Sequence, residues 1–282
     1  MDKQLDAIGI GCRRCASSFL HEQLNGHPEI SKPLNGVHYF SNFSENSLHW
    51  YLKQLPAKKQ ETVLMEYSVS YAYPEYSIIS AKRIRALWPD VKLFVSVRNP
   101  IDRAFSDYLR SIRRLEIPSE MSFEDAIDTY PEFLTRGKFL EVIAPYFDFF
   151  PQTQIHVMFY DDLLISKETF LFPLYRFLNI EEYLTQNHDR SHHRGGHLKS
   201  PFLQSSLLTS KKILDQTANF LKCQDLWEAF KVKHMEKYKA LYKFNSVETK
   251  MADSTRNDLY LYYQSDIEWL QNLTNRSLKN WK

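Results

Sequence analysis

The sequence predicts an α/β fold in which a central, mostly parallel sheet is flanked by helices and followed by a helical layer at the C-terminal end. Short apolar runs of strand length alternate along the chain with amphipathic helical patterns. The 282 residues have an ordinary globular composition, with 43% hydrophobic and 25% charged side chains. No repeat or low-complexity linker divides them, so we expect one domain over residues 1–282.

The chain begins with an apolar run, a polar turn and an amphipathic helical pattern at residues 7–11, 12–15 and 16–24. These predict a buried strand, a tight loop and a helix. Such a unit directs loop N–H groups and a helix N-terminus at the sheet edge, where they hold anions such as phosphate. The cation of Arg14 and the hydroxyls of Ser17 and Ser18 add donors there. An ordinary strand-to-helix turn remains the alternative.

Later segments continue the alternation. Strands are expected at residues 62–65, 92–97 and 154–159, and helices at residues 100–114, 139–150, 167–178 and 255–270. Residues 187–201 are polar and contain Gly195 and Gly196, which is typical of a loop. The run from residue 198 to residue 282 has a helical pattern without strand alternation, so we place it as a helical layer over the sheet.

A second anion-binding candidate follows the strand at residues 92–97. Arg98 comes directly after that strand, Pro100 fits the first turn of a helix, and Ser106 lies two turns into it. Arg98 and Ser106 can therefore converge above the carboxyl edge of the sheet, where open α/β folds bind ligands. The alternative is an arginine that caps the strand, followed by a solvated helix face.

Charge and cysteine content bear on partners and compartment. A net charge of +2 is too small to gather nucleic acid through a global field. Residues 1–6 are polar and no stretch reaches the roughly 18 apolar residues of a membrane helix, so we expect no signal peptide and no membrane partner. Three cysteines without an export signal favour the cytoplasm. Cys12 and Cys15 have the spacing of a redox or metal motif, but one such pair is weak evidence.

Together these segments resemble sulfotransferases. Residues 8–18 followed by residues 27–30 are similar to the 5′-phosphosulfate loop of that family, and residues 98–108 are similar to its 3′-phosphate motif. Supporting segments resemble the bacterial and heparan-type branch at residues 32–40, 50–52, 66–71, 136–139, 159–163 and 194–196, and in the closing helix with Trp281.

The resemblance implies the donor 3′-phosphoadenosine-5′-phosphosulfate (PAPS), whose sulfonate passes to a hydroxyl or an amine without a metal. It implies donor-binding residues at the 5′-phosphosulfate (Arg13, Arg14, Cys15, Ala16, Ser17 and Ser18), at the 3′-phosphate (Arg98 and Ser106) and over the nucleotide (Arg194, Gly195 and Gly196). Much of the family has lysine where this chain has Arg14; tyrosylprotein sulfotransferases are similar in carrying arginine. A guanidinium stays charged and bridges two oxygens, so the catalytic role of Arg14 would be electrostatic.

The acceptor side departs from the family pattern. Glycan sulfotransferases carry Lys-Glu-x-His-Phe-Phe-Asp with the glutamate as base, whereas residues 35–41 lack the lysine and both carboxylates and have Gly36 at the glutamate's position. His38 keeps its matching position, and an imidazole with a pKa of about 6.5 can accept a proton at neutral pH. A packing histidine is the alternative. Glu66 is the other candidate, as base or as the residue that orients His38.

The expected acceptor is a small molecule, such as a natural product. Tyr67 stands where many glycan-binding members have lysine, and His38, Tyr39 and Tyr71 match positions near the acceptor. The absence of lysine at both acceptor-side positions, 35 and 67, favours a neutral or cationic acceptor over a polyanionic glycan. A catalytically impaired protein that binds PAPS, or a glycan sulfotransferase with an altered base, remains open. A kinase would need the P-loop lysine and Mg²⁺ ligands, which are missing. No oligomeric state follows from the sequence.

Overall fold

The computed structural model describes residues 4–57, 62–114, 116–118, 120–185, 197–198, 244–245 and 250–282, with the backbone alone at residues 32–35, 197–198 and 244–245. The chain forms two compact units. The first comprises Met1–Ala104, Leu134–His188 and Arg256–Lys282, and the second comprises Phe105–Phe133 and Asp189–Thr255. The expectation of one domain over residues 1–282 stays a prediction.

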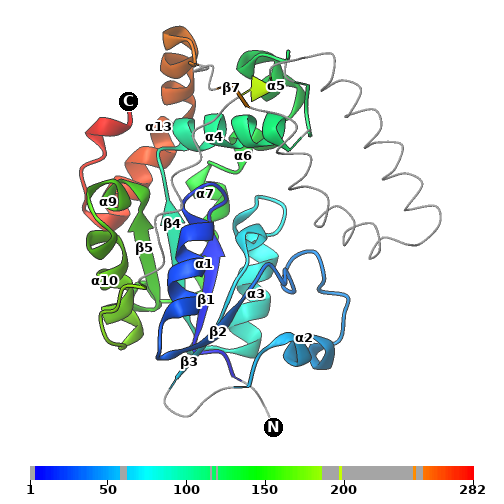
Figure 1. The fold of residues 1–282 in the computed structure, drawn as a ribbon, viewed down its shortest axis with the longest axis vertical. Helices are drawn as coiled ribbons and strands as arrows, with labels where there is room; N and C mark the ends of the chain where they lie inside the picture. Colours follow the sequence, from blue (N-terminus) through cyan, green and yellow to red (C-terminus); the bar gives the residue numbers. More distant parts are fainter. Residues whose placement is uncertain are drawn as a thin grey trace, which may run out of the picture. The chain divides into compact units, whose positions relative to one another are not determined.

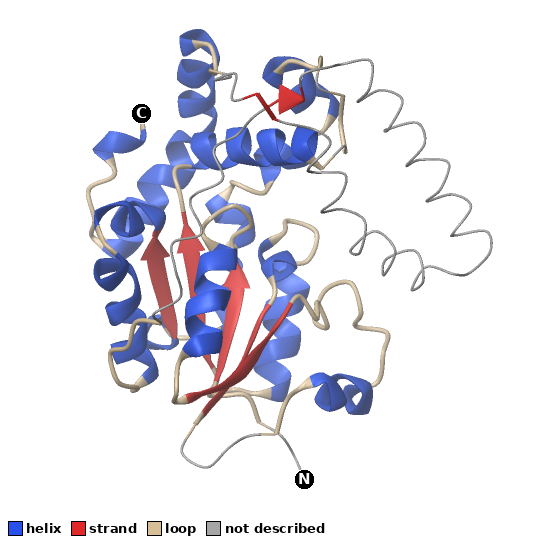
Figure 2. Cartoon of the chain, viewed as in Figure 1, coloured by secondary structure: helices blue, strands red, loops and turns tan. Residues whose placement is uncertain are grey.

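The first unit contains a five-stranded, all-parallel sheet (Figure 2). Its strands are arranged in the order β2(Ile30–Asn35), β3(Val63–Tyr67), β1(Ala7–Gly11), β4(Lys92–Val97) and β5(Ile155–Phe159). The predicted α/β fold with a parallel sheet is confirmed, as are the four strands read from apolar runs. Chain order reverses at β1, which lies between β3 and β4 (Figure 1). In open α/β sheets, ligands bind beyond the carboxyl ends of strands at such a reversal.

The strand β2 was missing from the sequence prediction. Its segment contains Lys32 and Pro33 and lacks an apolar run, so it has no strand signal of its own. A proline cannot donate to the ladder and is confined to edge strands and bulges. β2 is the edge strand, and its register against β3 shifts between Ser31 and Leu34, on either side of the proline. Its place at the edge explains how the sheet tolerates this sequence.

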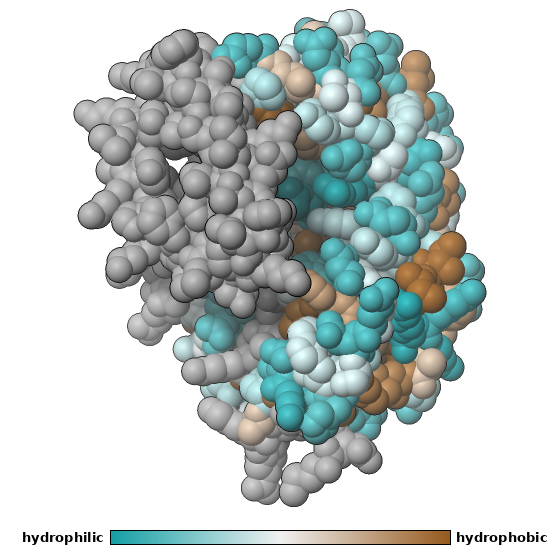
Figure 3. Space-filling model, turned by 90° about the vertical axis from the view of Figure 1, so that its right-hand side faces the viewer, coloured by the Kyte–Doolittle hydropathy of each residue, from teal (hydrophilic) through white to brown (hydrophobic). Residues whose placement is uncertain are grey.

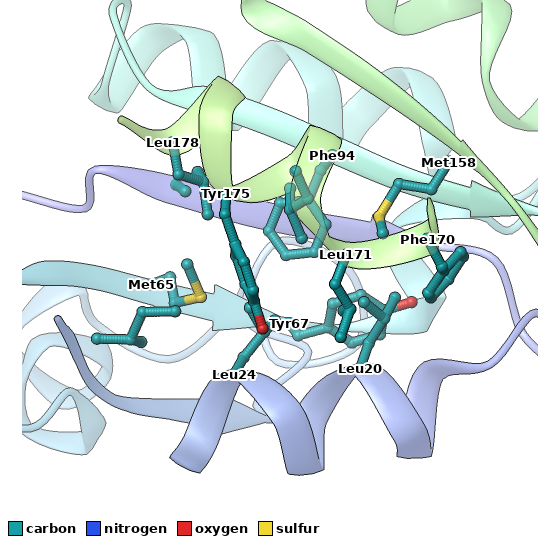
Figure 4. Close-up of a cluster of buried hydrophobic side chains, with 13 residues drawn as sticks. Leu20, Leu24, Met65, Tyr67, Phe94, Met158, Phe170, Leu171, Tyr175 and Leu178 are labelled. Atoms are coloured by element: carbon teal, nitrogen blue, oxygen red, sulfur yellow. The ribbon is translucent and has the colours of Figure 1, made fainter. Parts of the chain in front are cut away.

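Helices α1(Ser17–Gly26) and α10(Lys167–Leu178) cover one face of the sheet. Figure 4 shows Leu20 and Leu24 of α1 meeting Leu171 and Tyr175 of α10 over the buried side chains of the strands. All four are 0% exposed. The remaining helices of this unit, in chain order, are α2(Leu48–Gln54), η1(Val69–Ala72), α3(Ser77–Leu87), α7(Phe139–Val142), α8(Ala144–Phe149), η2(Gln152–Gln154), α9(Tyr160–Ile165) and η3(Lys279–Trp281).

One predicted helix is divided. The pattern over residues 139–150 predicted a single helix, but the structure has α7 and α8 with a break at Ile143. Pro145 occupies the start of α8, where its missing N–H costs nothing. A proline at that position cannot continue the hydrogen bonds of α7, so the chain starts a new helix.

The second unit contains most of α4(Pro100–Arg113), together with α5(Phe123–Thr129) and a two-stranded antiparallel ladder of β6(His197–Leu198) and β7(Phe244–Asn245). Helix α6(Glu132–Thr135) and helix α13(Asp253–Thr274) each belong partly to both units. The predicted helices at residues 100–114, 167–178 and 255–270 are confirmed as α4, α10 and α13. The predicted helical C-terminal end is confirmed by α13, whereas β6 and β7 were not predicted, because a two-residue strand carries too little pattern to be recognised.

The described surface is mixed in polarity. On the face drawn in Figure 3, hydrophobic patches are small and separated by hydrophilic residues. None of the helices within the described ranges combines the length and apolar character that crossing a bilayer requires.

Candidate functional site

Three neighbouring strands bring the loop after β1 and the segment after β2 to one edge of the sheet. In the register of the sheet, Gly9 of β1 pairs with Tyr67 of β3, which pairs with Asn35 of β2. Parallel strands lie about 4.8 Å apart, so β1 and β2 are about 10 Å apart at this level. The loop after β1 and the segment after β2 therefore leave the same edge within reach of one small ligand.

The loop after β1 has an unusual backbone. Arg14 and Ala16 both have φ of 68°, in the left-handed region that non-glycine residues enter at a cost of about 1–3 kcal/mol each. The surroundings hold the loop in place: the Cys12 N–H donates to the Ser96 carbonyl over 2.9 Å, and the buried Tyr67 hydroxyl donates to the Gly11 carbonyl over 2.8 Å. Left-handed residues in a short loop turn N–H groups into an anion-binding concavity.

Helix α1 starts at this loop. The first N–H groups of a helix have no intrahelical acceptor, and the helix dipole places partial positive charge at the same end. No acidic residue lies in the first turn of α1. The Ser17 side chain is half-buried and the Ser18 side chain is exposed. The start of α1 is thus suited to an anion.

Arginine cations converge on the loop. Burial raises the pKa of the Cys15 thiol. The hydrogen bond from Cys12 and the cations of Arg103, Arg98 and Arg14 lower this pKa, and together they outweigh burial, so the pKa lies below the ordinary value. Both thiols are buried and are not joined by a disulfide, and the Cys15 thiol donates to the Arg13 carbonyl over 3.7 Å. The thiol thus reports positive potential inside the loop, which is the condition for holding a phosphate.

Arg98 is held by stacking. Its guanidinium lies over the ring of Tyr160, 4.5 Å from the centroid. Within the described part of the chain, no acidic side chain forms an ion pair with it. Next to it, Asn99 starts helix α4: its side-chain oxygen accepts the Ile101 N–H over 3.0 Å, and Pro100 takes the first helical position. The cation is therefore positioned without being neutralised by a described carboxylate.

His38 follows β2 at the same edge. It is half-buried with φ of 57°, and its N–H donates to the Ser68 hydroxyl over 3.0 Å. Nδ1 of its ring lies 2.6 Å from the Ser70 hydroxyl. Burial lowers the pKa of His38, so the imidazole is neutral at pH 7. A Cβ on Gly36 would come within 3.3 Å of Nε2, so the glycine leaves space at that nitrogen.

Glu66 lies beneath this segment and is 0% exposed. It accepts hydrogen bonds from the hydroxyls of Tyr51, Ser68 and Tyr71, those from Ser68 and Tyr71 over 2.6 Å. Burial raises the pKa of Glu66, and these three hydrogen bonds only partly offset the shift. Through Ser68 the carboxylate supports the backbone of His38, which matches the orienting role.

Comparison with known proteins adds the family. The sequence matches the sulfotransferase domain family over residues 5–255. The chain belongs to this family, whose members use PAPS. Among its curated relatives is the mouse (Mus musculus) heparan sulfate glucosamine 3-O-sulfotransferase 3A1, 29% identical over 194 residues, or 66% of this chain and 49% of that protein. The human (Homo sapiens) heparan sulfate glucosamine 3-O-sulfotransferase 5 is 30% identical over 193 residues, or 64% of this chain and 55% of that protein.

The chain spans about half the length of these curated relatives. Among solved structures, a sulfotransferase from Alicyclobacillus acidocaldarius aligns over 99% of both chains with a TM-score of 0.69 and 18% identity. That likeness shows the shared fold. The resemblance to sulfotransferases predicted from the two phosphate motifs is thus confirmed.

The predicted acceptor residues near His38 differ in exposure. Tyr39 is half-buried and its ring stacks on Tyr51, with centroids 4.2 Å apart. Tyr67 and Tyr71 are 0% exposed, and their hydroxyls donate to Gly11 and Glu66 inside the protein. In this conformation neither ring is open to an acceptor, and their predicted contact with one stays a prediction.

The remaining donor-binding predictions also stay predictions. Ser106 is half-buried on α4, six residues after Pro100, and belongs to the second unit. The segment Arg194, Gly195 and Gly196 lies outside the described residues.

The structure adds residues that the sequence analysis did not single out. Arg103 is fully buried and contributes charge at the loop, and Ser41, Ser68 and Ser70 surround His38. For Arg103 the spacing after Arg98 was an available signal, because one helical turn separates position 103 from the start of α4. Single serines carry no such signal.

Proposed function

We propose that this chain is a sulfotransferase that moves the sulfonate of PAPS to a hydroxyl or amine of a small-molecule acceptor, with His38 as the base. Its main support is that the loop after β1, with its arginine cations, and His38, whose Nε2 a Cβ on Gly36 would approach to 3.3 Å, leave the same edge of the sheet. An anion site and a proton acceptor at one sheet edge suit transfer of a charged group to a protic acceptor.

The residues at this edge fit the donor. The loop N–H groups, the start of α1 and Arg14 suit the 5′-phosphosulfate, and Arg98 suits the 3′-phosphate, with Ser106 as its predicted partner. After the hydrogen bond from Cys12, the cations of Arg103, Arg98 and Arg14 also lower the pKa of the buried Cys15 thiol, which supports a positive potential at this place. When bound, PAPS supplies the sulfonate, and its phosphate end becomes the leaving group.

Each protein group has a separate task in this proposal. The Arg14 guanidinium and the loop N–H groups stabilise negative charge on phosphate oxygens, and an arginine does this without giving up a proton. His38 takes the proton of the acceptor at Nε2, and its lowered pKa leaves the ring neutral at pH 7. Glu66 acts through Ser68 to orient the backbone of His38.

The acceptor class rests on the space and charge around His38. Gly36 replaces a side chain that would crowd Nε2, and Tyr39 lies directly after His38 with a half-buried ring. Asn35 and Tyr67 stand at the two acceptor-side positions where glycan-binding members have lysine. We infer a small neutral or cationic acceptor, such as a natural-product alcohol, phenol or amine. The curated relatives named above are heparan sulfate sulfotransferases, so a glycan is the competing acceptor.

The test is transfer of labelled sulfonate from PAPS to a panel of small alcohols, phenols and amines, beside desulfated heparan precursor polysaccharide. We expect turnover of a small acceptor, a loss of about 10²-fold or more in His38→Ala, and unchanged donor affinity in that variant. His49→Ala, which removes an exposed histidine, is the matched control. Turnover of the polysaccharide alone would overturn the acceptor class. Tight binding of the desulfated donor without transfer to any acceptor would instead indicate a binding protein.

A further inference from the structure

Behind His38 lies a closed circuit of hydrogen bonds that includes two buried hydroxyls. Nδ1 of His38 lies 2.6 Å from the Ser70 hydroxyl, which lies 2.5 Å from the Ser41 hydroxyl. The Ser41 hydroxyl in turn lies 3.2 Å from the backbone carbonyl of His38. Ser70 is 2% exposed and Ser41 is 5% exposed, so bulk water does not reach the two hydroxyls. Each proton in the circuit must therefore be shared among these groups.

The carbonyl oxygen sets the direction of the circuit, because it can only accept a hydrogen bond. Ser41 therefore donates to the His38 carbonyl, and its oxygen accepts from Ser70. Ser70 has then used its one proton, so it accepts from Nδ1–H of His38. The His38 carbonyl also accepts the N–H groups of Ser41 and Phe43, over 3.2 Å and 3.1 Å, in either order. The reverse order, from Ser41 to Ser70 to Nδ1, leaves the contact between the Ser41 hydroxyl and this carbonyl without a proton, so it makes two side-chain hydrogen bonds where the first order makes three.

We propose that Ser70 and Ser41 are positioning residues that hold His38 as its Nδ1–H tautomer, with the lone pair at Nε2. The role rests on the proposed function, because it matters only if Nε2 receives the acceptor proton. Gly36 leaves space at Nε2, whereas Nδ1 is engaged by Ser70. When Nε2 takes up a proton, Nδ1–H continues to donate to Ser70 and no hydroxyl of the circuit has to rotate. The other tautomer already carries a proton at Nε2 and cannot act as the base there.

The direct test is nitrogen NMR of the full chain labelled at histidine nitrogens. The signals of His38 are identified among the 10 histidines by their loss in His38→Asn. For the wild type above the pKa of His38, we expect a protonated Nδ1 and an unprotonated Nε2. A protonated Nε2 in the wild type would overturn the proposal without any variant of the two serines.

The serine variants test the effect on catalysis. Ser70→Ala removes the acceptor of Nδ1–H, so we expect a mixed tautomer signal and a kcat lowered by about 10-fold or more, up to the loss in His38→Ala, at unchanged donor affinity. Ser41→Ala should give a smaller loss of the same kind. Ser77→Ala is the matched control, because Ser77 is also buried but donates to the Val142 carbonyl over 3.1 Å, outside the circuit.

Failure of the positioning role and failure of His38 as the base give different results. A Ser70→Ala protein that keeps the Nδ1–H signal and the wild-type kcat would overturn the positioning role. If His38→Ala keeps its turnover, the proposed base is wrong, whatever the tautomer. If Ser70→Ala does not fold, the tautomer of the wild type and the kcat of Ser41→Ala still decide the question.

Discussion

Arg98 is the cation whose loss should weaken nucleotide binding most directly. Its guanidinium stacks on Tyr160 at 4.5 Å and has no ion pair with a described acidic side chain, so its charge is available for a ligand. A charge-assisted pair with a phosphate contributes about 1.5–3 kcal/mol. Losing it in Arg98→Ala should therefore raise the Kd of 3′-phosphoadenosine-5′-phosphate (PAP), the desulfated donor, by about 10- to 150-fold.

The stability of Arg98→Ala should change much less than its affinity. The stacking on Tyr160 is worth about 0.5–1 kcal/mol at a partly exposed site, so the free energy of unfolding should fall by no more than about 1 kcal/mol. Isothermal titration calorimetry gives the Kd, and urea unfolding gives the stability. Arg176→Ala is the matched control, because that side chain is 69% exposed and pairs with Glu182 on the surface. An unchanged Kd in Arg98→Ala would refute the placement of the 3′-phosphate.

Three further predictions concern the base, the loop support and the core. Because burial lowers the pKa of His38, kcat should be level above pH 6.5 and fall as the imidazole protonates at lower pH; a pH–rate profile of His38→Ala should lack that fall. Tyr67→Phe leaves the buried Gly11 carbonyl without that donor, so we expect about 1–3 kcal/mol less stability in urea unfolding and weaker PAP binding. A Cβ in Gly9→Ala would lie 2.0 Å from the Tyr67 ring, so this variant should lose about 3 kcal/mol or more, and wild-type stability would contradict the packing described.

Local pattern was enough to predict the strands, the loop and the helix at which the donor is proposed to bind. The strand, loop and helix at β1 and α1 are contiguous in sequence, and Arg98 directly follows a strongly apolar strand. Parallel strands bring their carboxyl ends to one edge, so the strand pattern alone could place two separate motifs together. The left-handed backbone at Arg14 and Ala16 could not be predicted, because neither residue type favours it.

The acceptor side depends on contacts between distant segments. Glu66 and Tyr67 are neighbours on β3, and successive residues of a strand point to opposite faces of the sheet. The sequence alone does not say which side chain faces which layer; in the structure the Tyr67 hydroxyl supports Gly11, and Glu66 binds the hydroxyls near His38. The serine circuit joins segments about 30 residues apart, and single serines have no periodic signal.

We expect the donor nucleotide of sulfotransferases to bind at the carboxyl end of β1. The most direct test is a calorimetric titration of the full chain with PAP, beside ATP with Mg²⁺. The arginines and the loop predict micromolar binding of PAP and no measurable binding of ATP with Mg²⁺, since the P-loop lysine that a nucleoside triphosphate site needs is absent. Binding of ATP with Mg²⁺ but not of PAP would contradict the account and reopen the assignment of both phosphate motifs.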